Sequence, residues 1–161
     1  MALAVVEADP QGADALWLLR EAAIEARGLY PELHAPGDPW PTNAPAGPRG
    51  VYLLGYADGK VVASGALRPL DDAVAEVRRM YVLPSARRAG HAAQILGALE
   101  AAARDMRYST LRLETGYRQL PAIALYLRSG YRRIDPFGPY ADDPTSVCLE
   151  KHVDGTRSSP P

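Results

Sequence analysis

The segment from Glu76 to Ala92 joins an apolar-rich strand, a proline break and the start of a long helix. The turn after Pro84 reads Arg87-Arg88-Ala89-Gly90-His91-Ala92. A helix start leaves backbone N–H groups without intrahelical partners and carries the positive end of the helix dipole. With accessible backbone at Gly90 and two arginines adding charge, this turn can therefore hold an anion such as a diphosphate, mainly with its main chain.

Hydrophobic periodicity predicts short strands that alternate with two substantial helices and one short helix. The expected strands are Leu3–Ala8, Val51–Ala57, Lys60–Leu67, Val74–Val82, Thr110–Thr115, Tyr131–Ile134 and Ser146–Lys151. The expected helices are Asp14–Arg27, Gly90–Tyr108 and Pro121–Arg128. The dipeptide Asp58-Gly59 predicts a tight hairpin, so the strands between residues 51 and 82 should form an antiparallel meander. The apolar stripe of the second helix then needs this sheet to cover it.

Residues 28–50 lose all periodicity. The segment contains Pro31, Pro36, Pro39, Pro41, Pro45 and Pro48. Proline interrupts both helices and central strands, so a long irregular segment is expected. Two interpretations stay equally open: a lid over an acceptor substrate, or a surface connection with no ligand role.

The charge balance of the chain bounds its partners. The 161 residues carry 18 Lys and Arg against 19 Asp and Glu, a formal net charge of −1. Such a chain has no global field that attracts nucleic acid or an anionic membrane. We therefore expect neither partner, and any basic site must be local.

The remaining composition fits one cytoplasmic domain over residues 1–153, followed by a polar tail at residues 154–161. The N-terminus shows neither a signal peptide nor a membrane-spanning run. Cys148, the one cysteine, lies in a strand-like run where a buried, inert thiol is expected. The three histidines, His34, His91 and His152, show no paired ligand spacing, so we expect no metal site.

The pattern Arg87-x-x-Gly90-x-Ala92 after the strand resembles the acyl-CoA pyrophosphate motif of the GNAT superfamily of N-acyltransferases. The resemblance continues through residues 111–116 and through the run from Gln119 to Tyr131. It implies an α+β fold, a three-layer α/β arrangement with a central mixed, mostly antiparallel sheet of six to seven strands. About four helices should flank this sheet.

The same resemblance implies acetyl-CoA as co-substrate. The pantetheine arm would run beside Met80, Tyr81 and Val82, and the diphosphate would contact residues 87–92. Arg88 and His91 stand where the superfamily usually has glycine and an aliphatic residue. Gln119 replaces a common asparagine that helps to hold the cofactor.

Acetyl transfer to an amine needs a base, because alkylamines with a pKa near about 10 are protonated at neutral pH. Glu76 matches the position of the general base in some members. Strand alternation predicts that it shares a face with Arg78, Met80 and Val82, where it can look toward the acyl group or pair with Arg78. A salt-bridged strand glutamate is an equally good interpretation, with Glu114 or water as alternative bases.

The resemblance also places an oxyanion-stabilising N–H between Met80 and Val82. Tyr126 matches the tyrosine that protonates the leaving CoA thiolate in many members. Its alternative interpretation is a tyrosine of the core. Glu76 and Tyr126 are thus the predicted catalytic residues.

The predicted function is N-acetyl transfer from acetyl-CoA to a primary amine of a small molecule or peptide, by direct attack in a ternary complex. A catalytically silent acyl-CoA-binding module is the alternative. A nucleotide-binding protein is disfavoured, because no Walker lysine and no Gly-x-Gly-x-x-Gly is present. The acceptor, the acyl-chain preference and the oligomeric state stay open, and a homodimer is compatible with the sequence.

Overall fold

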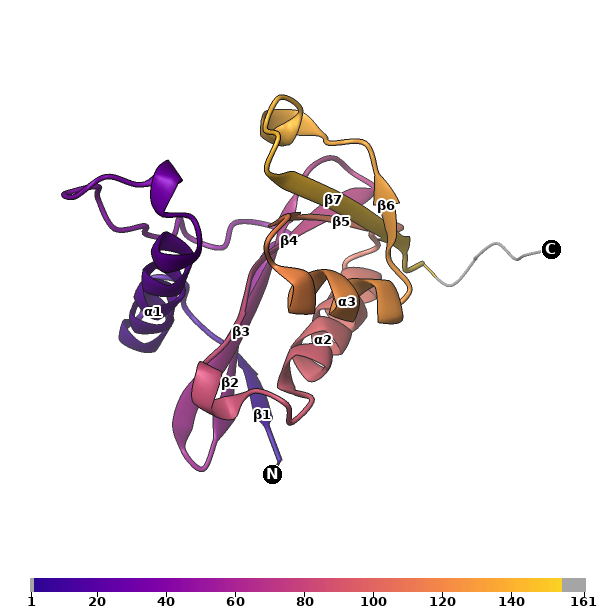
Figure 1. Ribbon diagram of the computed structural model, residues 1–161. Coiled ribbons are helices and arrows are strands. Elements are labelled where there is room, and N and C mark those ends of the chain that lie inside the picture. The colour runs from indigo at the N-terminus through magenta and orange to yellow at the C-terminus, as the bar shows by residue number, and fades with distance from the viewer. Residues whose placement is uncertain (1, 155–161) are drawn as a thin grey trace.

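A computed structural model describes residues 2–154, which contain seven strands and three α-helices (Figure 1). The strands are β1 (Ala4–Glu7), β2 (Val51–Ala57), β3 (Lys60–Pro69), β4 (Val74–Val82), β5 (Thr110–Gly116), β6 (Arg132–Ile134) and β7 (Ser146–His152). The helices are α1 (Ala13–Leu29), α2 (His91–Asp105) and α3 (Leu120–Arg128). The predicted polar tail lies outside the described residues from position 155 onward.

All seven strands form one sheet in the order β1-β2-β3-β4-β5-β7-β6. The predicted hairpin and meander are confirmed, because β2, β3 and β4 pair antiparallel in sequence order. Asp58 and Gly59 both have positive φ at the hairpin turn, 52° and 77°, as a two-residue type I′ turn requires. Only the β4–β5 pair is parallel, so the mixed, mostly antiparallel sheet is also confirmed.

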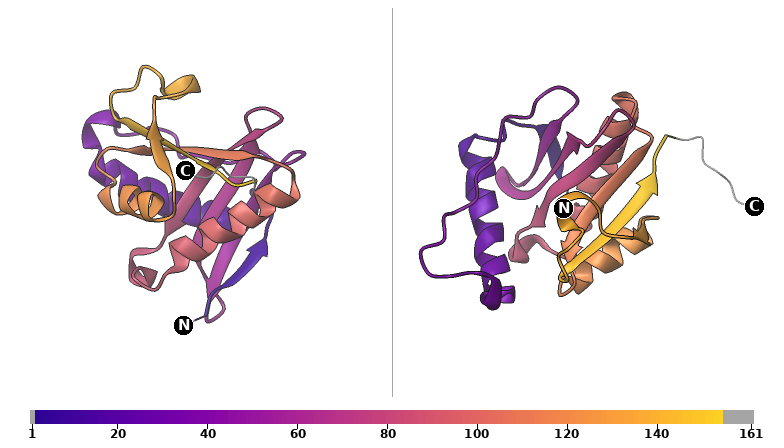
Figure 2. Two further views of the ribbon diagram at one scale, coloured as in Figure 1. Left: turned by 90° about the vertical axis from the view of Figure 1, so that its right-hand side faces the viewer. Right: turned by 90° about the horizontal axis from the view of Figure 1, so that it is seen from above.

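Helices cover both faces of the sheet in three layers (Figures 1 and 2). Ile95 and Leu99 of α2 pack on the larger core with Val77 and Leu113. On the opposite face, Leu18 of α1 belongs to a smaller core with residues of β2 and β3. None of the helices in residues 2–154 is long and apolar enough to cross a membrane.

The number of α-helices in the described residues is three rather than about four. Between α1 and β2 the proline-rich segment forms only a 3-10 turn, Pro31–Leu33. Arg27 holds this segment along α1, since its guanidinium donates to the carbonyls of Asp38 and Pro39 at 3.3 and 2.7 Å. As expected from the prolines, residues 30–50 form an irregular segment without an α-helix, the strap.

Two irregularities in the middle of the sheet, an opening between β4 and β5 and a bulge in β4, shape the candidate site. Strands β4 and β5 pair only where residues 74–77 of β4 lie beside residues 110–113 of β5. Beyond residue 77, the edge of β4 that faces β5 therefore has no strand partner within the described chain. On the other edge, the β3–β4 register shifts opposite Gly65, where Arg79 adopts φ 59°. A Cβ on Gly65 would lie 2.5 Å from the Ile95 side chain, so only glycine lets α2 approach this bulge.

Candidate functional site

The turn between β4 and α2 offers a run of free backbone donors. Helix α2 begins at His91, and its first helical bond runs from the N–H of Gln94 to the carbonyl of Gly90 at 3.1 Å. In residues 2–154, the N–H groups of residues 88–93 find no hydrogen-bond partner. Gly90 has φ 80°, and a Cβ there would meet nothing within 4 Å. An open anion-binding turn at the predicted position is the result.

The arginines of this turn behave differently from each other. Arg88 adopts the left-handed conformation that glycine usually occupies, with φ 66°, and its side chain is exposed. Arg87 instead donates to the carbonyl of Val82 at 2.9 Å and to the carboxylate of Glu25 at 2.8 Å. The hydrogen bond from Arg87 holds the pKa of the Glu25 carboxyl below its usual range. Arg87 is therefore anchored to α1, which the sequence did not predict.

The side chains of His91 and Gln119 were both predicted to lie at the cofactor site. The His91 side chain is 4% exposed, and its Nδ1 is enclosed without a hydrogen-bond partner in the described part of the chain. It fills the place of an aliphatic residue, so only its N–H faces the turn. Gln119 precedes α3 without capping it through its side chain. Ala89 is exposed, and Ala92 packs against the larger core.

The bulge at Arg79 makes the predicted facing of Glu76 wrong. Ala75 and Val77 point into the core beneath α2, which puts Glu76 on the α1 side of the sheet. After the extra residue, Met80 and Val82 point toward α2. Glu76 therefore lies on the opposite face from Met80 and Val82, because a single bulge reverses the alternation.

Both oxygens of Glu76 are occupied. Arg68 of β3, rather than the expected Arg78, donates from two nitrogens to Oε1 at 2.8 Å. The Tyr140 hydroxyl donates to Oε2 at 2.7 Å. Burial, with the hydrogen bond to Glu76 next, raises the pKa of Tyr140 to about 12. With its side chain only 1% exposed, Glu76 acts as a buried acceptor that anchors two neighbours.

Replacing Glu76 with glutamine should destabilise the fold more than it changes cofactor binding. The amide keeps the shape but loses the charge that Arg68 and Tyr140 meet, and a charge-assisted bond contributes about 1.5–3 kcal/mol. We expect a loss of about 3 kcal/mol in the free energy of unfolding, measured by urea titration. The exposed Glu7 is the control, and equal effects of E76Q and E7Q would contradict the anchoring role.

Glu114 stands at the mouth of the opening between β4 and β5. It follows Leu113, the last residue of β5 that pairs with β4. The Ser146 hydroxyl donates to its carboxylate at 2.6 Å, which leaves the second oxygen without a hydrogen bond from the described residues. Burial, with smaller contributions from Asp143 and Glu76, raises the pKa of the Glu114 carboxyl. A half-buried carboxyl of this kind suits proton transfer near neutral pH.

Tyr126 lies on α3 with its side chain 5% exposed. Its ring packs edge-on against Tyr131 at 5.8 Å between centroids. The hydroxyl forms no hydrogen bond with the described residues. It is also not fully enclosed, because the one polar side-chain atom in residues 2–154 that is both enclosed and unpartnered is His91 Nδ1. Burial raises the pKa of Tyr126, so the phenol keeps its proton. The side chain is thus a core tyrosine whose protonated hydroxyl has no partner in the described residues.

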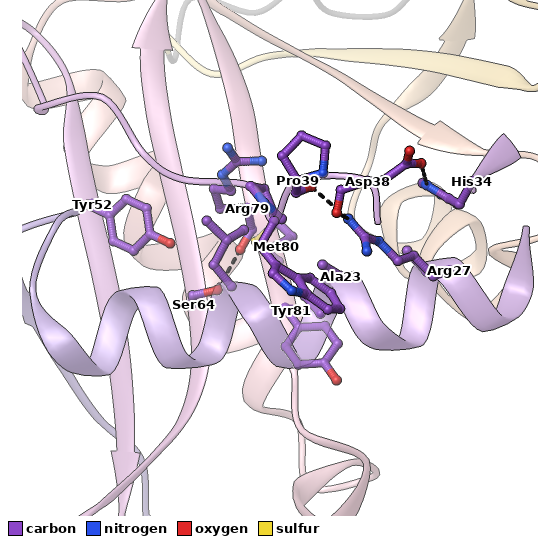
Figure 3. A pocket seen from close by; sticks show the side chains of 15 residues that line it. Ala23, Arg27, His34, Asp38, Pro39, Tyr52, Ser64, Arg79, Met80 and Tyr81 are labelled. Carbon is purple, nitrogen blue, oxygen red and sulfur yellow. Dashed lines mark hydrogen bonds and ion pairs between the residues drawn. The ribbon is translucent and has the colours of Figure 1, made fainter. Parts of the chain in front are cut away.

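Two hollows lie on the α1 side of the bulge. The larger, of about 580 Å³, lies between α1, the strap and the strands (Figure 3). Its lining comprises Leu19, Ala22, Ala23, Ala26, Arg27, His34, Asp38, Pro39, Trp40, Pro41, Tyr52, Ser64, Arg79, Met80 and Tyr81. The smaller, of about 270 Å³, lies under residues 43–50, and both hollows include Tyr52 and Arg79 in their walls.

Arg79 also fastens the strap to the sheet. Its guanidinium donates to Asn43 Oδ1 at 2.9 Å and to the carbonyl of Thr42 at 3.3 Å, and Asn43 in turn donates to the carbonyl of Pro10. This contact was not predictable from the alternation of the strand. The signal that could have found it is the consecutive pair Arg78-Arg79, which interrupts the alternation of an otherwise regular strand.

Cys148 is buried on β7, and burial raises the pKa of its thiol, as expected of a structural cysteine. Residues 2–154 show no group of three or more His, Cys, Asp or Glu arranged to hold a metal ion.

Comparison with known proteins agrees with this geometry. The family model described as the acetyltransferase (GNAT) family matches residues 8–131. The chain therefore belongs to the GNAT acetyltransferases, and the resemblance seen in its turn and later helix is confirmed.

Relatives extend the likeness over most of the fold. An "IAA acetyltransferase" of Azospirillum brasilense is 40% identical over 101 residues, which are 62% of this chain and about two thirds (66%) of that protein. A structure from Klebsiella pneumoniae, named as an acyl-CoA N-acyltransferase, has 32% identity and a TM-score of 0.76, with coverage of 94% of this chain and 97% of that one. A GNAT acetyltransferase of Elizabethkingia anophelis with acetyl-CoA bound shares the fold at 16% identity and a TM-score of 0.66, covering 93% and 97%.

Proposed function

We propose that residues 1–153 form one domain that transfers an acetyl group from acetyl-CoA to a primary amine by direct attack in a ternary complex. One observation carries the proposal. The opening between β4 and β5 has an anion-binding turn at one end, Glu114 at its mouth and the free hydroxyl of Tyr126 nearby on α3. A diphosphate, an amine and a thioester need these three features, respectively.

The main chain suits acetyl-CoA. The free N–H groups of residues 88–93 would hold the diphosphate, and Arg88 would add charge there. The unpaired edge of β4 at Met80, Tyr81 and Val82 would hydrogen-bond the pantetheine arm. Gln119 would contact it near α3. When bound, acetyl-CoA supplies an activated acetyl thioester and a thiolate leaving group.

Glu114 is the residue that we propose as general base, ahead of Glu76. Its raised pKa and its free oxygen let it accept a proton from an ammonium group, directly or through a water. Glu76 already accepts hydrogen bonds at both oxygens and lies almost fully buried. Its role is to position Arg68 and Tyr140 beside the acceptor.

Tyr126 is the proton donor that we propose for the thiolate. Its hydroxyl keeps its proton because burial raises the pKa, and no described residue competes for it. A free hydroxyl on a ring that is packed against Tyr131 breaks no protein hydrogen bond before it donates.

The test is CoA thiol release from acetyl-CoA with a panel of amines. Turnover that depends on the amine would support the proposal. Calorimetric binding of CoA without turnover for any amine would favour a silent acyl-CoA-binding module instead.

Replacing Gly90 with valine should weaken CoA binding at least about tenfold in calorimetry. The left-handed φ of Gly90 disfavours a β-branched residue, so the turn must shift and its donors lose alignment. Gly97 is the control, because it lies inside α2 in open space with nothing within 4 Å of a Cβ. Unchanged affinity in a folded G90V protein would overturn the assignment of the turn.

A further inference from the structure

Within residues 2–154, three arginines around the two hollows form no ion pair with a carboxylate, although the chain as a whole has a net charge of −1. Arg27 donates only to backbone carbonyls and stacks on Trp40 at 3.9 Å. Arg79 donates to an amide and a carbonyl. Arg78 forms no hydrogen bond or ion pair in residues 2–154, although it is half-buried. These three guanidinium groups thus form no ion pair with a described residue.

The bulge brings two of these arginines together. Arg78 and Arg79 are consecutive, and both line the smaller hollow together with Arg68. No acidic residue lines that hollow, and the charge of Arg68 is already met by Glu76. The carboxylate of Glu114 lies near Arg78, but the two groups form no ion pair. Arg78 and Arg79 therefore remain as two cationic groups with room beside them.

This arrangement is costly without an anion. Burial lowers the pKa of Arg79, and the adjacent charge of Arg78 lowers it further. Two guanidinium groups that repel each other in a partly desolvated place gain most from a bound carboxylate, which matches their planar geometry. An acceptor rich in positive charge, such as a polyamine, would add to the repulsion instead.

The larger hollow indicates the rest of the ligand. Its walls include three alanines of α1 and the rings of Trp40, Tyr52 and Tyr81. These surfaces suit an apolar or aromatic group. Arg79 belongs to both hollows, so a molecule whose apolar part occupies the larger hollow can reach the arginines of the bulge.

We propose that the acceptor is an apolar or aromatic amino acid whose carboxylate binds Arg78 and Arg79. The inference rests on the proposed acetyl transfer and names its substrate class. Arg78 lies close enough to Glu114 for its charge to offset part of the rise in the pKa of that carboxyl. A carboxylate at Arg78 therefore brings the adjacent α-amine toward the general base.

The experiment compares amino acids with their decarboxylated amines, phenylalanine against phenethylamine and tryptophan against tryptamine, in the CoA-release assay. We expect kcat/KM to be at least tenfold higher for the amino acid. In R78Q the ratio of kcat/KM for the amino acid to kcat/KM for its amine should fall about tenfold to a hundredfold. The ratio is the readout, because the lost charge of Arg78 also acts on Glu114 and this effect is common to both substrates. The exposed Arg133 on β6, at the far edge of the sheet, provides the matched control R133Q.

A preference for the decarboxylated amines, or a carboxylate preference that R78Q leaves intact, would overturn the inference while acetyl transfer stood. If no amine were acetylated, acetyl transfer itself would fail. Thermal shifts with phenylpropanoate, which has no amine, then test the carboxylate site alone. Stabilisation of the wild type and R133Q but not R78Q supports the site, and equal shifts in all three proteins exclude it.

Discussion

Replacing Glu114 with glutamine should lower kcat/KM for the amine about 10²-fold or more at neutral pH. The amide keeps the hydrogen bond from Ser146 but cannot take a proton from the acceptor. General base catalysis typically contributes about 10²- to 10⁴-fold. The expected measurement is a pH–rate profile by CoA thiol release, with calorimetry to confirm that acetyl-CoA still binds.

The pH dependence has a defined sign. Burial raises the pKa of Glu114 in the folded protein, and the base must be ionised, so wild-type kcat/KM falls as the pH drops through that raised pKa. E114Q should lack this acidic limb. A profile that keeps the limb and full activity would move the base role to Glu76 or to solvent water.

The E114Q substitution should raise the stability of the protein although it lowers the activity. A glutamate whose folded pKa lies above its unfolded pKa favours folding at low pH and loses that contribution as the pH rises through the folded pKa. At neutral pH the buried carboxylate of Glu114 is a net cost, so E114Q should unfold at a slightly higher temperature than the wild type. Lower activity with higher stability separates a catalytic carboxylate from a structural one.

Replacing Tyr126 with phenylalanine should lower kcat at least about tenfold, and up to the 10²- to 10⁴-fold typical of general acid catalysis. The ring stays packed against Tyr131, and the lost hydroxyl has no partner in the described residues, so stability should change little. Affinity for acetyl-CoA should also move little, because the hydroxyl acts on the leaving thiolate. Steady-state kinetics and calorimetry give the two quantities separately.

Tyr131 is the matched control for this substitution. Its hydroxyl donates to the buried Glu100 at 2.9 Å, so Y131F should lower stability and leave kcat close to the wild type. Retained kcat with weakened cofactor affinity in Y126F would make the phenol a cofactor ligand, and the thiolate would then leave without its help.

Local patterns were sufficient to predict most of the fold. The Asp58-Gly59 turn, the alternation in β2 and β3 and the apolar stripe of α2 each follow from short-range sequence periodicity. The anion-binding turn was also predictable, because it depends on a few consecutive residues at a helix start. The number of flanking helices implied by the resemblance was slightly too high, whereas the irregular course of the segment before β2 was expected from its prolines.

The sheet face on which Glu76 lies, and the residues that hydrogen-bond to it, were not predictable in the same way. The bulge at Arg79 depends on how closely α2 approaches Gly65, which is a tertiary contact. That bulge turned Glu76 away from Met80, and residues distant in sequence, Arg68 and Tyr140, became its partners. Alternation alone carries no information about these contacts.

The ion pair between Arg87 and Glu25 would couple the two proposed substrate sites energetically. Glu25 lies on α1, the helix that walls the larger hollow, whereas Arg87 belongs to the turn that would hold the diphosphate. A diphosphate that draws Arg87 away must compete with Glu25, leaving Tyr81 as the remaining donor to that carboxylate. By thermodynamic reciprocity, an acceptor that shifts α1 changes the affinity for the cofactor as much as the cofactor changes the affinity for the acceptor. One ion pair would thus make the two proposed binding steps depend on each other equally, whichever substrate binds first.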